Sequence, residues 1–158
     1  MVSAISVANE LIRLGKQDNN YFTPMQLLKL VYIAHGWMFG FFSKPLINDS
    51  IEAWKYGPVI PELYHKVKAY GGNQIPQEIN SLFSFNNEQL NEEEKSVVNF
   101  VYRKYGNLSG VKLSMITHQN DTPWSRIFSL DGRGDIIPND LIRQHYAELS
   151  SKVLAENG

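Results

Sequence analysis

The amino-acid sequence predicts a mainly α-helical fold, a single domain over residues 1–158 in which about six helices surround one central, buried helix. The longest apolar segment, residues 23–42, begins with a clear helix start and is apolar over more than one face, as is typical of a helix covered by others. Elsewhere, apolar residues recur mostly at the helical period. Only residues 51–54 and 135–137 suggest strands, so we expect at most a small two- or three-stranded sheet.

The central helix has the strongest local signals. Thr23 is expected to cap it, Pro24 suits its first turn, and Gln26 completes a capping-box pattern. Gly36 and Gly40 lie four residues apart. In a membrane that spacing would favour helix dimerisation, whereas in a soluble chain it more often lets a neighbouring helix approach closely. We therefore expect close helix packing along the second half of this segment.

The flanking segments predict shorter elements. Residues 3–14 carry a helical apolar stripe, and Gly15 is expected to end that helix. After the first predicted strand, Gly57 and Pro58 are expected to interrupt regular structure. A proline then opens a predicted helix over residues 62–70.

The second half of the chain predicts a long connection followed by further helices. Residues 73–87 are polar, and at most a short turn is expected over residues 79–83. Asn91 and Glu94 form a second capping-box pattern, and the positive end of the helix dipole explains the acidic residues 92–94 better than a metal site does. Predicted helices cover residues 92–105, residues 110–117 after Ser109, a short stretch from Pro123 after Thr122, and residues 139–155.

Composition excludes several classes of protein. The chain has 15 basic and 16 acidic residues spread along its length, which argues against a nucleic-acid partner. It has no cysteine, so disulfides, thiol nucleophiles and cysteine-based zinc sites are excluded. Residues 1–15 resemble an amphipathic helix more than a signal peptide, and Lys29 and His35 interrupt the central apolar run, so we expect a cytoplasmic protein with no membrane partner.

The residues that could support catalysis are few. The four histidines lack metal-ligand spacing, and no phosphate loop, dinucleotide fingerprint or nucleophile elbow is present. The most suggestive loop holds His118, Asp121 and Thr122 beside Trp124, where a hydrolytic or metal role is conceivable. A structural interpretation is favoured, in which Asp121 or Thr122 caps the next helix, His118 bonds loop backbone and Trp124 fills the core. The sequence therefore predicts no enzymatic activity, cofactor or metal.

Aromatic residues provide the remaining feature. Trp54, Tyr56 and Tyr64 lie around the Gly57-Pro58 pair. Aromatic anchors near loops are typical of protein–protein hot spots, but they are also ordinary core residues in small domains. From these residues alone the two interpretations stay open, and the chain is best described as a helical binding module.

Three stretches together resemble the Panacea antitoxin domain family, which includes SocA-type antitoxins and GepA-type phage-associated proteins. The stretches are TPMQLLKLVYIAHGW at residues 23–37, PLINDSIEAWKYGPVIPELYHKVKAYG at residues 45–71 and LSMITHQNDTPW at residues 113–124. The family pattern is met by Thr23, Leu28, Lys29, Leu30, Tyr32, Ala53, Trp54, Tyr56, Gly57, Pro58, Val59, Pro61, Tyr64, Thr117, His118 and Trp124.

The resemblance implies an antitoxin that binds and neutralises a cognate protein toxin encoded by an adjacent gene. In the SocA-type variant it also implies an adaptor that delivers the toxin to an AAA+ protease. The candidate partner-binding or signature residues, here called the signature residues, are Lys29, Tyr32, Trp54, Tyr56, Gly57, Pro58, Tyr64, His118 and Trp124. An exposed Lys29 beside Trp54 and Tyr56 would mark a partner surface, whereas full burial of all three would mark a scaffold.

Overall fold

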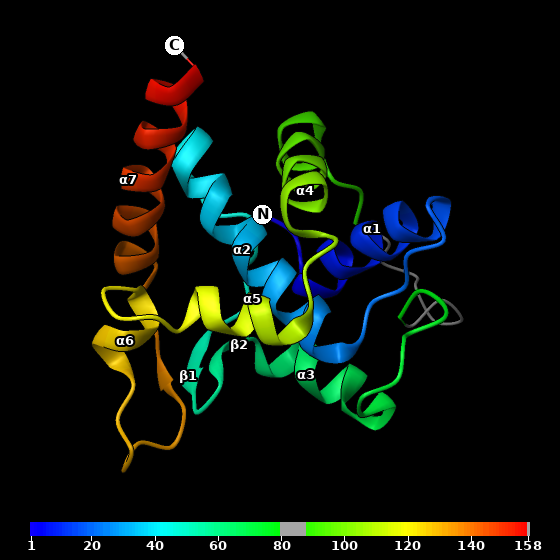
Figure 1. Ribbon diagram of the computed structural model, residues 1–158, viewed down its shortest axis with the longest axis horizontal. Helices are drawn as coiled ribbons and strands as arrows, with labels where there is room; N and C mark the ends of the chain where they lie inside the picture. The colour runs from blue at the N-terminus through cyan, green and yellow to red at the C-terminus, as the bar shows by residue number, and fades with distance from the viewer. Residues whose placement is uncertain (80–87, 158) are drawn as a thin grey trace.

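Helix α2 (Pro24–Phe42) runs through the centre of the protein in the computed structural model, which describes residues 1–79 and 88–157. Figure 1 shows α2 between α7 (Asn139–Asn157) and α4 (Glu92–Tyr105), with α5 (Gly110–Thr117) crossing its first half. The described residues form seven α-helices and one small sheet, which confirms the predicted mainly α fold around a central helix.

The sequence explains why α2 occupies this position. Thr23 and Gln26 form the predicted capping box, in which the Gln26 amide donates to Thr23 Oγ1 at 3.3 Å and the Thr23 amide donates to Gln26 Oε1 at 2.9 Å. These reciprocal bonds satisfy two amide groups that a helix start otherwise leaves free. Every residue from Leu27 to Phe39 is buried, so all faces of the helix are covered by other elements.

Two glycines let α7 lie directly against α2. A Cβ atom at Gly36 would overlap the ring of Tyr146 on α7, and one at Gly40 would lie 2.8 Å from the Tyr146 carbonyl oxygen. The expectation that this glycine pair permits close approach of a neighbouring helix is confirmed.

The remaining helices lie close to the predicted boundaries, although the helix predicted over residues 62–70 is α-helical only to Val67 and continues as a 3₁₀ helix. Helix α1 (Ala4–Gln17) continues past Gly15, so the predicted stop there was wrong. Gly15 is needed instead because a Cβ atom would overlap the carbonyl oxygen of Asn20, which folds back on the helix end. The other short helices are α3 (Pro61–Val67), the 3₁₀ helix η1 (Lys68–Tyr70) and α6 (Pro123–Ile127). Of the short turn expected over residues 79–83, residues 80–83 lie outside the described ranges.

Three short antiparallel strands form the sheet in the order β2-β1-β3. They are β1 (Glu52–Trp54), β2 (Gly57–Val59) and β3 (Asp135–Ile136). Gly57 and Pro58 were expected to interrupt regular structure, but they begin β2 and form a tight β1–β2 hairpin in which Ala53 pairs with Pro58. Proline is tolerated there because β2 is an edge strand.

Within the two described ranges, every helix falls short of the length or the hydropathy that crossing a membrane requires.

Candidate functional site

Lys29 is a buried charged residue on the central helix. Its side chain is 3% exposed, and its Nζ donates to the carbonyl oxygen of Pro58 at 3.0 Å. Gly57, at φ +118°, makes this approach possible, because a Cβ atom there would lie 3.0 Å from Nζ. No carboxylate among the described residues lies within ion-pair distance of Lys29. Burial lowers the pKa of Lys29 to about 8, so the ammonium is still mostly protonated at neutral pH.

Lys29 lies at the floor of a pocket of about 380 Å³ between α2, the hairpin and α3, which we call the hairpin pocket. Tyr56 is 61% exposed at its margin, and the rings of Trp54 and Tyr64 meet edge to face with centroids 5.0 Å apart. The lining residues are Pro24, Met25, Leu28, Lys29, Trp54, Lys55, Tyr56, Val59, Tyr64, Lys68 and Gly71. The described lining is therefore mainly apolar, with three lysines and no acidic residue.

The third stretch of the resemblance, residues 113–124, bonds the backbone of the hairpin. The hydroxyl of Ser114 on α5 donates to the Tyr56 carbonyl oxygen at 2.6 Å, and Nε1 of Trp124 on α6 donates to the Trp54 carbonyl oxygen at 2.6 Å. The ring of His118 packs edge to face on Trp124 with centroids 5.3 Å apart. The three stretches that are separate in sequence thus meet around one hairpin.

All of the signature residues except Tyr32 fall into two groups. Lys29, Trp54, Tyr56 and Tyr64 line the hairpin pocket, and Gly57 with Pro58 shapes its floor. His118 and Trp124 hold the hairpin in place. Tyr32 belongs to neither group.

Tyr32 lies in the core, 1% exposed, with its ring edge to face with that of Tyr146 at a centroid distance of 6.4 Å. Burial raises the pKa of Tyr32 far above its ordinary value. We assign it a packing role.

The His118 loop agrees with the structural interpretation at its helix cap, whereas His118 bonds helix backbone instead of loop backbone and Trp124 is half-buried. The Thr122 hydroxyl caps α6 by accepting from the Ser125 amide at 3.3 Å, and the His118 ring bonds the Ser114 carbonyl oxygen. Asp121 is exposed. Among residues 1–79 and 88–157, no three side chains of the histidine, aspartate or glutamate type gather in a way that could hold a metal ion.

Sequence reasoning missed part of the pocket lining. Met25, Lys55 and Lys68 were not assigned to the candidate site, although Lys68 follows Tyr64 by four residues and Met25 precedes Lys29 by four. Residues four apart on a helix share one side, and that spacing was the available signal. What the sequence could not supply is the contact between α2 and the hairpin.

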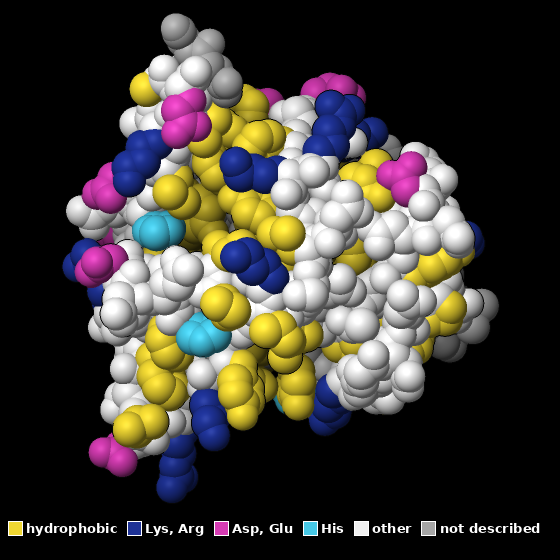
Figure 2. Space-filling view, in the orientation of Figure 1, with side chains coloured by type: hydrophobic (Ala, Val, Ile, Leu, Met, Phe, Trp, Pro, Cys, Tyr) yellow, Lys and Arg dark blue, Asp and Glu magenta, His cyan; other side chains and the backbone are white. Residues whose placement is uncertain are grey.

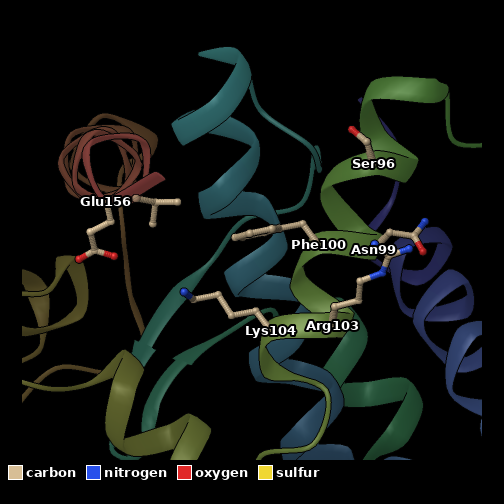
Figure 3. A pocket seen from close by; sticks show the side chains of 7 residues that line it. Ser96, Asn99, Phe100, Arg103, Lys104 and Glu156 are labelled. Carbon is tan, nitrogen blue, oxygen red and sulfur yellow. The ribbon is translucent and has the colours of Figure 1, made fainter. Parts of the chain in front are cut away.

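A second hollow of about 790 Å³ lies between α4 and α7, and Figure 3 shows it from close by. Phe100 and Lys104 extend from α4 toward the α2 and α7 side, whereas Arg103 extends toward Asn99. Glu156 on α7 lines the opposite side. This cleft contains no signature residue and carries both signs of charge, so it lacks the one-sided character of the hairpin pocket.

Comparison with known protein families identifies the family to which the chain belongs. The family model described as "Antitoxin SocA-like, Panacea domain" matches residues 27–125, more than half of the chain. The chain belongs to this family. The matched range contains Lys29, the hairpin, α5 and Trp124, whereas all of β3 and all of α7 follow it.

One characterised relative supports the Panacea assignment. Antitoxin SocA of Caulobacter vibrioides (strain NA1000 / CB15N) is 28% identical over 132 residues, covering 80% of this chain and 70% of the relative. No solved structure matches the chain significantly. The matched range therefore contains most of the residues that line the hairpin pocket.

Proposed function

We propose that this Panacea-domain protein, acting in the cytoplasm as one domain over its whole length, is an antitoxin that neutralises a protein toxin by direct binding. The toxin is expected to be the product of an adjacent gene. Membership in the antitoxin family is the observation that carries the proposal. The mechanism it implies is stoichiometric, because the antitoxin covers or distorts its partner and has no need to turn over a substrate.

The exposed apolar residues support a binding role for the hairpin side of the molecule. Of the eight large hydrophobic residues exposed in the described chain, four lie on the first turn of α2, on the hairpin or on α5. They are Met25, Tyr56, Val111 and Met115. We call them the hairpin face.

Two contacts join the elements of the hairpin face. The start of α5 adjoins Met25, whose Cγ would lie 3.1 Å from a Cβ at Gly110, and Ser114 bonds the Tyr56 backbone. Figure 2 shows hydrophobic side chains gathered over α5 and the hairpin, with lysine or arginine at their lower margin. Exposed aromatic and methionine side chains in such a setting are typical interface anchors.

Growth of a bacterial host tests the proposal. The adjacent reading frame is expressed under an inducible promoter, alone and together with this protein. We expect growth arrest with the frame alone and recovery with the wild-type protein. If the frame is harmless alone, or remains toxic when this protein is present in excess, the proposal is wrong for this pair.

The adaptor alternative suggested by the sequence resemblance makes a different prediction for the same strains. An adaptor would shorten the half-life of the partner in a way that depends on an AAA+ protease. Direct neutralisation leaves the half-life of the partner unchanged or longer, because the complex protects it. Pulse-chase measurement in a protease-deficient host and its parent separates the two.

A further inference from the structure

We propose that the hairpin pocket receives a carboxylate presented on an apolar segment of the partner protein, and that the Lys29 ammonium binds this carboxylate at the pocket floor. The inference rests on the proposed function for the identity of the partner. It adds the chemistry of the contact and the residue that makes it.

The charges around the pocket are one-sided. Lys29, Lys55 and Lys68 line it, and no acidic residue of the described chain does. Lys55 and Lys68 are exposed at the margin, where they attract an anion from solvent, whereas Lys29 is buried at the floor. The charged side chains that line the pocket and that an approaching carboxylate meets are therefore all positive.

Lys29 also has fewer hydrogen-bond acceptors than its ammonium group can use. An ammonium group has three N–H donors, and the described residues supply one acceptor, the Pro58 carbonyl oxygen. A buried cation without a counter-ion is costly, and a carboxylate at bonding distance supplies both the missing charge and a strong acceptor.

The side chains that form the walls of the hairpin pocket indicate which kind of partner group would carry the carboxylate. Leu28 and Val59 are buried, and the Trp54 and Tyr64 rings stand edge to face beside them. These surfaces favour methylene or aromatic groups. A volume of about 380 Å³ holds one or two side chains. A nucleic-acid strand would need a long basic groove, whereas this pocket has a single buried cation and the whole chain has a net charge of −1.

Titration with a small probe tests the site without the toxin. The probe is 3-phenylpropanoate, which joins an aromatic ring to a carboxylate, and its uncharged control is 3-phenylpropanamide. Binding to the full-length protein is followed by NMR at pH 7 through the indole N–H signals of Trp54 and Trp124. We expect saturable shifts with the acid and a dissociation constant at least about tenfold larger for the amide. Equal binding of acid and amide, or shifts that leave the Trp54 signal unmoved, would overturn the proposal.

Three variants locate the charge that is responsible. Lys29→Met should bind acid and amide alike. The double variant Lys55→Gln with Lys68→Gln changes only exposed residues and should weaken the acid a few-fold without affecting the amide. Lys104→Gln, an exposed lysine of the α4–α7 cleft, is the matched control and should leave both constants unchanged. If Lys29→Met does not fold, the double variant is decisive, and an unchanged ratio of acid to amide binding in it contradicts the proposal.

Growth rescue separates failure of this inference from failure of the proposed function. If the wild type rescues growth and folded Lys29→Met rescues equally well, the antitoxin role stands and the carboxylate contact is refuted. If the wild type fails to rescue while it still prefers the acid probe, the carboxylate site stands and the antitoxin role is refuted for that partner.

Discussion

Replacing Lys29 with methionine should change the pH dependence of stability in a defined direction. The pKa of Lys29 is lowered by burial from 10.5 to about 8 in the folded protein. Between these values the unfolded chain binds more protons than the folded one, so stability of the wild type rises with pH from 8 to 10.5. Below pH 8 the cost of burying the charge is fully present, at about 3 kcal/mol for a shift of this size.

Methionine has a similar length and does not titrate. The substitution removes the buried charge and also the hydrogen bond to Pro58, which is worth about 1 kcal/mol at every pH. The Lys29→Met variant should therefore be more stable than the wild type by about 2 kcal/mol at pH 7, and less stable by about 1 kcal/mol near pH 10.5. The difference in free energy of unfolding between the variant and the wild type therefore changes sign between pH 7 and pH 10.5.

Urea unfolding of both proteins at pH 7, 8, 9 and 10 measures this difference. The other titratable residues of the pocket, Lys55, Tyr56, Tyr64 and Lys68, are present in both proteins, so subtraction largely removes their contribution. Lys104→Met, at an exposed lysine outside the hairpin pocket, is the control for the change from lysine to methionine itself. A Lys29→Met difference that is constant from pH 7 to 10 would refute the reasoning.

Three further predictions concern the scaffold. His35 is buried and its Nδ1 accepts from the amides of Leu46 and Ile47, and burial lowers its pKa from 6.5 to about 4. Urea titrations should therefore show the free energy of unfolding falling by about 3 kcal/mol as pH drops from 6.5 to 4, and His35→Gln should reduce this loss. Gly36→Ala forces a methyl group into the Tyr146 ring and should lower the free energy of unfolding, measured by thermal unfolding, by about 2 kcal/mol or more. Gly72→Ala, where the added methyl group meets open space, should lower it little. Trp124→Phe removes the hydrogen bond to the hairpin and should cost about 1 kcal/mol by urea unfolding while weakening partner binding.

Local patterns in the sequence predicted the helix starts well. Thr23 and Asn91 each cap a helix as expected, because a capping box depends only on residues three positions apart, and of the two residues considered for the third cap, Asp121 and Thr122, it is Thr122 that caps. The central position of α2 was also predictable, since a segment that is apolar on all faces must be covered on all faces.

Features that depend on how the backbone pairs across a turn were not predictable in the same way. Helix α1 continues to Gln17 and Gly15 is required by the nearby carbonyl of Asn20, and the Gly57-Pro58 pair starts a strand that pairs with β1 across a tight hairpin. Glycine and proline mark both turns, but the residue types alone do not specify which backbone groups meet there.

The candidate site was predicted in part for the same reason. The signature identified Lys29 and the aromatic residues, but the sequence presented burial and partner contact as exclusive alternatives for them. In the fold, Lys29 is buried while Tyr56 next to it is exposed, because one pocket has both a floor and a margin. Whether a side chain lies at the floor depends on how α2 meets the hairpin, which no local pattern contains.

The affinity of the purified partner for variants of the hairpin face tests the central claim most directly. Tyr56, at 61% exposed, and Leu154 on α7, at 63%, are matched in exposure but lie on different elements. By calorimetric titration, Tyr56→Ser should weaken binding by at least about tenfold while Leu154→Ser binds as the wild type does, both with unchanged melting temperature. Binding of Tyr56→Ser within about twofold of the wild type would contradict the account.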